Sequence, residues 1–165
     1  MIEVDINNLK LLSKKERYTT VLKQVDALLE NENNVIANLA NVTSLLKSTF
    51  DYYLWVGFYL YDKDKNNLVL GPFQGSLACT RIEIGKGVCG TSFRDKETII
   101  VEDVNNFPGH IFCDSKSKSE IVIPVLYDGK AIGVLDVDSA EYAFFDEIDK
   151  IYLEELVNKI SNILS

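Results

Sequence analysis

The pattern of apolar positions predicts helices at both ends of the chain. Apolar residues recur at helical spacing over residues 14–29 and again over residues 35–46. The polar run at 30–34 between them is rich in Asn, which both ends helices and caps the next one. A third apolar stripe follows Asp146, where an acidic first turn is typical of a helix start.

Between these helices the pattern changes to that of strands. An aromatic and β-branched run at 52–61 favours a strand, and a polar turn at 62–67 leads into a short strand at 68–70. The Gly- and Pro-containing run at 71–75 predicts a loop, and Asp128-Gly129 predicts a hairpin turn. Further strands are expected at residues 81–84, 98–101, 121–126 and 131–137. This hairpin-rich order favours an α+β fold with an antiparallel sheet over a parallel βαβ fold.

Size and charge narrow the possible functions. The chain has 165 residues, so residues 1–165 are expected to form a single domain. The net charge of −8 offers no basic surface, so no nucleic-acid partner is expected and a small molecule or protein fits better. No apolar run reaches membrane-spanning length, and the first ten residues lack a signal-peptide pattern; a cytoplasmic protein that does not bind membranes is expected.

Three cysteines, Cys79, Cys89 and Cys113, lie beside loop-forming residues and, for Cys113, near His110, the single histidine. Such surroundings indicate site residues rather than core residues, and an odd number of thiols in a reducing compartment favours redox chemistry. Cys89 falls in the first turn of a short helix expected at 88–94, where the helix dipole lowers a thiol pKa. On local grounds it is a candidate nucleophile, or equally a small packing residue. Cys113 lies within a long polar loop at 107–119, as expected of a functional loop.

Three other chemistries fit parts of the sequence less well. GKGVCG at 85–90 matches the dinucleotide-binding pattern, but its neighbouring strands look antiparallel; a tight turn into a helix whose N–H groups hold a carboxylate fits better. A Cys-His hydrolase would have to use His110, with Asp103 or Asp114 orienting it. The cysteines form no Cys-x₂-Cys pair, so no metal is expected.

Acidic residues gather where two strands meet. Side chains alternate along a strand, so Asp136 and Asp138 face the same side, with α-carbons about 7 Å apart. Glu120 opens the neighbouring strand and is expected to join them. Close carboxylates raise one another's pKa, so the cluster suits binding of an ammonium group or retention of a proton for acid catalysis.

Seven segments together resemble the free methionine-(R)-sulfoxide reductases, which are GAF-domain enzymes, and the resemblance runs from Asn41 through the last helix. The segments are WVGFYL at 55–60, LGPFQG at 70–75, ACTRI at 78–82, GKGVCG at 85–90, FPGHIFCD at 107–114, SEIV at 119–122 and GVLDVDS at 133–139. The resemblance implies a GAF sheet of about six antiparallel strands with helices behind it, in a homodimer.

The resemblance also implies an activity and roles for particular residues. Free L-methionine-(R)-sulfoxide would be reduced to methionine, with no bound cofactor and with thioredoxin as external reductant. The residues that it implicates are Cys113 as nucleophile, Cys79 as its disulfide partner, Cys89 as an auxiliary thiol, Glu120, Asp136 and Asp138 as ligands of the ammonium group and sulfoxide oxygen, and Trp55 and Tyr59 as walls of the methyl pocket. The competing interpretation is a non-catalytic GAF module that senses a small ligand or the redox state.

Overall fold

The computed structural model describes residues 11–30, 32–111 and 114–164. Within them the chain forms, in order, α2 (Lys14–Leu29), α3 (Val35–Thr49), β1 (Trp55–Asp62), β2 (Asn67–Gln74), β3 (Arg81–Glu83), α4 (Gly87–Asp95), β4 (Ile99–Val101), the short 3₁₀ helix η1 (Val104–Asn106), β5 (Ser119–Tyr127), β6 (Lys130–Ser139) and α5 (Glu147–Ser161).

The strands form one sheet in the order β3-β2-β1-β6-β5-β4, and every neighbouring pair is antiparallel. The hairpin between β5 and β6 turns at Asp128 and Gly129, both with positive φ, as the sequence predicts. The predicted α+β class with an antiparallel sheet is therefore confirmed.

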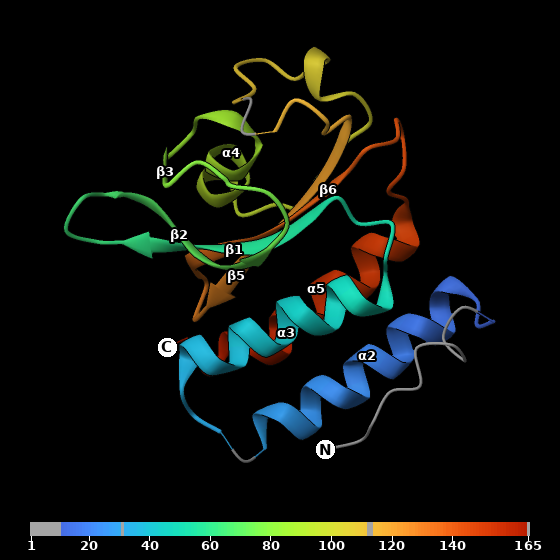
Figure 1. The fold of residues 1–165 in the computed structure, drawn as a ribbon. Coiled ribbons are helices and arrows are strands. Elements are labelled where there is room, and N and C mark those ends of the chain that lie inside the picture. The colour runs from blue at the N-terminus through green and yellow to red at the C-terminus, as the bar shows by residue number, and fades with distance from the viewer. Residues whose placement is uncertain (1–10, 31, 112–113, 165) are drawn as a thin grey trace.

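Each face of the sheet has its own apolar core. Side chains alternate along β1, so Val56 and Phe58 point toward the helices α3 and α5, whereas Trp55 and Tyr59 point toward α4. The two N-terminal helices differ in their contact with the sheet. Only α3 packs on it extensively; α2 packs against α3 and α5 as an outer layer (Figure 1).

The expected loop at 71–75 is wrong for most of its length, because β2 continues to Gln74. Gly57 of β1 pairs with Phe73, and Val56 pairs with Gln74. The other edge of β2 pairs with β3 only from Asn67 to Val69, so Pro72 lies beyond that ladder, where its missing N–H costs no pairing with β3. Strand pairing has overridden the local preference of Gly and Pro for turns.

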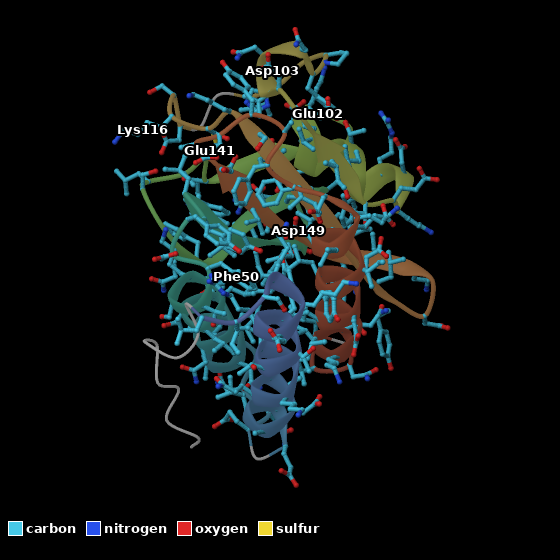
Figure 2. All side chains as sticks on the ribbon, turned by 90° about the vertical axis from the view of Figure 1, so that its right-hand side faces the viewer. Phe50, Glu102, Asp103, Lys116, Glu141 and Asp149 are labelled. Atoms are coloured by element: carbon cyan, nitrogen blue, oxygen red, sulfur yellow. The ribbon has the colours of Figure 1, made fainter. Side chains whose placement is uncertain are left out.

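The two ends of the molecule differ in what they expose. Phe50 and Asp149 lie among the helices and are fully buried. The opposite end carries the loops, with the polar side chains labelled there in Figure 2: Glu102, Asp103, Lys116 and Glu141. Among the described residues, no helix is long and apolar enough to cross a membrane.

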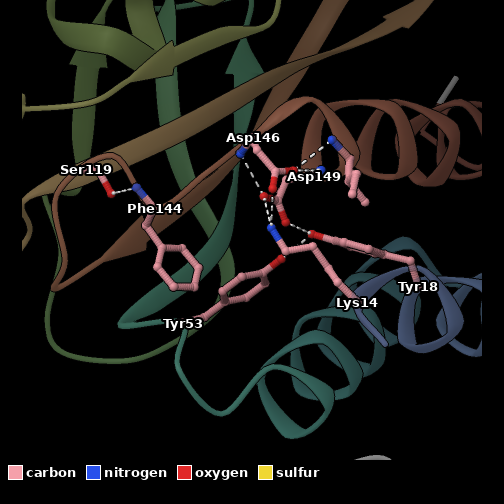
Figure 3. Close-up of polar contacts among 8 residues, drawn as sticks. Lys14, Tyr18, Tyr53, Ser119, Phe144, Asp146 and Asp149 are labelled. Atoms are coloured by element: carbon pink, nitrogen blue, oxygen red, sulfur yellow. Dashed lines mark hydrogen bonds and ion pairs between the residues drawn. The ribbon is translucent and has the colours of Figure 1, made fainter. Parts of the chain in front are cut away.

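A buried polar network joins α2 to α5 and to the start of β1 (Figure 3). The Tyr18 hydroxyl donates to Asp149 Oδ1 at 2.7 Å and lies 2.5 Å from the Tyr53 hydroxyl, which therefore donates to Tyr18. Lys14 Nζ lies 2.6 Å from the second oxygen of Asp149. Since Asp149 is completely buried, these contacts are what compensates its lost hydration.

Substituting Tyr18→Phe is expected to lower the free energy of unfolding by about 2–3 kcal/mol, because the buried Asp149 carboxylate and Tyr53 hydroxyl each lose a partner. Urea unfolding followed by circular dichroism measures this. Tyr142→Phe, at a side chain that is 56% exposed, is the matched control and should change little. Equal stabilities for the two variants would contradict a stabilising role for the network.

Candidate functional site

A pocket opens on the face of the sheet that α4 covers. Its walls come from β1, the β2–β3 connection, β3, the N-terminal end of α4, the segment before β5, and the strands β5 and β6. The lining residues are Trp55, Tyr59, Leu77, Ala78, Ile82, Lys86, Gly87, Val88, Cys89, His110, Ile111, Asp114, Ser117, Glu120, Asp136 and Asp138.

Strand register sets the floor of this pocket. Asp138 pairs with Trp55 on one side and with Glu120 on the other, so these three side chains form a row across β1, β6 and β5. Asp136 lies in the next row on the same face, opposite Gly57. The expectation that Glu120 joins the two aspartates on one face is confirmed.

The aromatic wall depends on a glycine. The Trp55 ring stacks between Tyr59 and Phe73, with ring centroids 6.0 and 5.4 Å away. A Cβ atom on Gly57 would lie 2.4 Å from the Trp55 ring, so only glycine lets the indole lie across this part of the sheet. Trp55 Nε1 donates to the Ser76 carbonyl at 3.1 Å, which fixes the ring in place.

Glu120, Asp136 and the Cys89 thiol form a buried cluster. One ligand atom from each of the three lies within 4.8 Å of the others, and Cys89 Sγ lies 4.0 Å from Glu120 Oε1. Burial raises the pKa of the Glu120 carboxyl well above its usual value, and Asp136 and then Asp138 raise it further. Burial and Asp138 raise the pKa of Asp136 in the same direction. The cluster therefore retains protons at neutral pH.

Asp136 has an oxygen with no internal partner. Its Oδ1 is buried and accepts no hydrogen bond from any described residue. Buried polar atoms are normally satisfied, so an orphan of this kind at a pocket wall indicates a place for a ligand's donor group.

Asp138 titrates differently from its neighbours. Desolvation raises its pKa, whereas a short hydrogen bond donated by the Ser117 hydroxyl lowers it, and the pKa comes to about 6. Asp138 is therefore mostly ionised at neutral pH while the deeper carboxyls stay protonated, so the pocket offers both a charge and an acid.

Of the two local alternatives for Cys89, the structure agrees with the second, a small packing residue. Cys89 is a free thiol with 4% of its surface exposed, in the apolar core under α4 rather than in a loop. Burial raises the pKa of this thiol, and the Asp136 and Glu120 carboxyls raise it further. These effects outweigh the helix dipole, which acts only at the first turn and gives a smaller contribution. Cys89 is accordingly held as a neutral thiol.

Cys79 lies on the β2–β3 connection, which contributes Leu77 and Ala78 to the pocket wall. Cys79 is disulfide-bonded, and its carbonyl accepts a hydrogen bond from the Tyr59 hydroxyl at 3.0 Å. The neighbouring Ser76 hydroxyl donates to Asp114 at 2.5 Å, which ties the β2–β3 connection to the loop that follows η1. Cys113 lies outside the described residues, so its expected role stays a prediction.

His110 lies inside the pocket rather than on the surface. Its side chain is 9% exposed, and Nδ1 is 3.8 Å from Glu120 Oε2. Burial lowers its pKa, while that of the Cys89 thiol is raised. An activated Cys-His pair needs the reverse of both shifts, so these two residues do not form a hydrolase dyad.

Two features of the pocket had weak sequence signals or none. Ser117 lies in an ordinary run of Ser and Lys, and nothing in that run predicts its hydrogen bond to Asp138. The start of α4, by contrast, agrees with the tight turn into a helix that GKGVCG predicts. Gly87 has φ +58°, and the N-cap residue Lys86 makes no side-chain capping bond. Gly87 and Val88 line the pocket, so N–H groups at the helix start lie beside it, and the antiparallel sheet excludes the dinucleotide-binding alternative.

Comparisons with known proteins agree with this geometry. A GAF-domain family model matches residues 39–165. A Saccharomyces cerevisiae protein named free methionine-R-sulfoxide reductase is 44% identical, over 94% of this chain and 90% of its own length. A free methionine-R-sulfoxide reductase from Neisseria meningitidis, solved in complex with its substrate, superposes with a TM-score of 0.90 at 47% identity, covering 93% of this chain and 91% of that one. A Staphylococcus aureus fRMsr structure with substrate gives 0.83 at 49% identity, covering 90% and 95%.

Proposed function

Since this chain belongs to the free methionine-(R)-sulfoxide reductase family of GAF-domain proteins, we propose that it reduces free L-methionine-(R)-sulfoxide to L-methionine. The observation that carries the proposal is the cluster of proton-retaining carboxyls at the floor of an aromatic-walled pocket, beside a disulfide-bonded cysteine. Reduction of a sulfoxide needs a proton donor for its oxygen and a thiol that can attack its sulfur. The protonated carboxyls of this pocket are candidate proton donors, and the cysteine beside them belongs to a candidate redox pair.

The proposed chemistry begins with attack of the Cys113 thiolate on the sulfoxide sulfur. A protonated carboxyl, from Glu120 or Asp136, hydrogen-bonds to the oxygen and protonates it as the sulfur–oxygen bond breaks. The bond between the Cys113 sulfur and the substrate sulfur then breaks as the oxygen is transferred to Cys113, which becomes a sulfenic acid, and methionine departs with its sulfur reduced by two electrons. The Cys79 thiol then displaces water from the sulfenic acid and forms a disulfide.

Thioredoxin, a dithiol reductant, is the proposed source of the electrons that reopen this bond. Exchange of its two thiols for the Cys79–Cys113 disulfide returns both enzyme cysteines to the reduced form. Cys89 is the proposed auxiliary thiol in recycling; its protonated state under α4 fits a secondary role rather than that of first nucleophile.

The proposed pocket selects the free amino acid through both of its charges. The ammonium group would bind ionised Asp138 and the unpartnered oxygen of Asp136. The carboxylate would accept hydrogen bonds from backbone N–H groups at the start of α4. Trp55 and Tyr59 would enclose the methyl group. A peptide bond removes both charges, so peptide-bound methionine sulfoxide should be rejected.

A single-turnover experiment tests this function against the sensor alternative. Reduced, desalted protein mixed with excess free methionine-(R)-sulfoxide should form about one methionine per chain and lose two titratable thiols. Addition of thioredoxin, thioredoxin reductase and NADPH should then give continuous turnover. A protein that only senses a ligand would bind the sulfoxide without forming methionine, and that result would refute the reductase.

The pKa of Asp138, about 6, predicts a pH limb for substrate capture. Above this value the carboxylate is ionised and pairs with the ammonium group; below it kcat/KM should fall roughly tenfold per pH unit. Asp138→Asn should lower kcat/KM at pH 7 and abolish this limb. Asp64→Asn, at an exposed carboxylate in the β1–β2 turn, should keep the wild-type profile. An unchanged limb in Asp138→Asn would assign it to another group.

The proposed assembly rests on the family resemblance alone. Residues 1–165 are proposed to form one GAF domain, which acts as a homodimer in the cytoplasm. Light scattering coupled to size-exclusion chromatography measures the dimer, and a single monomeric peak across the working concentration range would rule it out.

A further inference from the structure

The cluster beneath α4 has the composition of a site for a borderline-soft metal ion. A thiol sulfur and two carboxyl oxygens, from Cys89, Glu120 and Asp136, converge from three different elements, α4, β5 and β6. Thiolate together with carboxylate suits Zn²⁺ or Cd²⁺, whereas Mg²⁺ and Ca²⁺ prefer oxygen ligands only.

The distances are close to those of a tetrahedral site. Ligand atoms around tetrahedral zinc are separated by about 3.5 Å, given its usual bond lengths. Here all three atoms lie within 4.8 Å of one another, and Cys89 Sγ is 4.0 Å from Glu120 Oε1. Small side-chain rotations therefore suffice to bring them onto one ion.

A second observation points to a cationic ligand at this place. Asp136 is 93% buried, and its Oδ1 has no hydrogen-bond partner among the described residues although it lines the pocket. The atom needs either a donor group or a cation, and a metal ion in contact with the thiol and Glu120 would provide the latter.

We propose that Cys89, Glu120 and Asp136 form a Zn²⁺-binding site whose occupation excludes the ammonium and sulfoxide groups of the substrate, so that Zn²⁺ is a reversible competitive inhibitor. The metal site stands on the geometry alone; the competition rests on the proposed function. No electrons move in this step: the ion displaces the protons held by the thiol and the carboxyls, and they pass to solvent.

Co²⁺ is the probe, because a cobalt–thiolate bond gives a charge-transfer absorption band. The oxidised protein is titrated without dithiothreitol, so that Cys79 is held in its disulfide and Cys89 is a free thiol. One equivalent of Co²⁺ should produce the band, and Zn²⁺ should remove it by displacement.

Matched variants assign the ligands. Cys89→Ser should abolish the band, and Asp136→Asn should weaken Co²⁺ binding at least tenfold, since even outer-shell changes at metal sites cost 10–100-fold. Glu83→Gln, at an exposed carboxylate on β3, should bind as wild type. Thermal unfolding checks that each variant folds. If Cys89→Ser does not fold, the Co²⁺ affinity of Asp136→Asn still decides whether the site exists.

Three results would overturn the site: no thiolate band at stoichiometric Co²⁺, an unchanged band in Cys89→Ser, or wild-type Co²⁺ affinity in Asp136→Asn. Displacement of Co²⁺ by free methionine-(R)-sulfoxide tests the competition separately. Metal-free turnover is measured on the same preparation, so loss of the metal site and failure of the reductase function are distinguished.

Discussion

Cys113→Ser is expected to abolish formation of methionine from free L-methionine-(R)-sulfoxide, with dithiothreitol or with thioredoxin as reductant. A serine hydroxyl is not ionised at neutral pH and cannot take up the sulfoxide oxygen as a sulfenic acid, so the first chemical step is lost. Chromatographic measurement of methionine gives the rate directly. Substrate binding, followed by calorimetry, should remain because the carboxyl cluster is intact.

Cys79→Ser should separate the first step from the second. This variant should still form about one methionine per chain, but its sulfenic acid should persist and react with a trapping reagent such as dimedone. Thioredoxin-dependent turnover should fall, since no Cys79–Cys113 disulfide is available for exchange. If Cys89→Ser were inactive and Cys113→Ser active, the roles assigned to these two thiols would be reversed.

Glu120→Gln is expected to make the protein more stable and nearly inactive. Burial and the neighbouring aspartates raise the pKa of Glu120, so the folded state holds a proton that the unfolded state releases at neutral pH. The stability contributed by such a group is complete below the unfolded pKa of about 4.5 and is lost as pH rises toward the folded value. An amide carries no such penalty, so at pH 7–8 the variant should have a higher free energy of unfolding than the wild type, and the gain should vanish near pH 4.

The same substitution removes a proton donor for the sulfoxide oxygen, so kcat/KM should fall by about 10²–10⁴-fold. Thermal unfolding over a pH series and steady-state kinetics measure the two effects on one sample. Glu102→Gln is the matched control because its carboxylate is exposed at the loop end of the molecule (Figure 2). A Glu120→Gln protein with lower stability at pH 8 would show that the carboxyl is ionised and satisfied in the folded state.

Much of the fold and of the pocket floor could be predicted because these depend on short-range patterns. Alternation along β6 places Asp136 and Asp138 on one face, and strand pairing then fixes Glu120 beside them. The extension of β2 through Gly71 and Pro72 could not be predicted from local preference, since it depends on pairing with β1. The register in which one strand pairs with another depends on the tertiary structure, which local preferences do not contain.

The protonation of the Cys89 thiol could not be predicted from the sequence for a related physical reason. Its place in the first turn of α4 is visible in the sequence and suggests a lowered thiol pKa. The opposite shift arises from burial and from carboxyls on β5 and β6, which the chain reaches only 31 and 47 residues later. His110 is similar: a lone histidine in a loop gives no sign that its side chain will be buried beside Glu120.

The most direct test of the proposed function is turnover by the wild-type protein of three substrates under one set of conditions with dithiothreitol. The substrates are free L-methionine-(R)-sulfoxide, the free S epimer and a blocked peptide that contains methionine-(R)-sulfoxide. Turnover of the free R epimer alone is expected, because the proposed pocket binds both the ammonium and the carboxylate group of the free amino acid. Comparable turnover of the peptide, or none of any sulfoxide, would contradict the assignment of this pocket as a free methionine-(R)-sulfoxide reductase site.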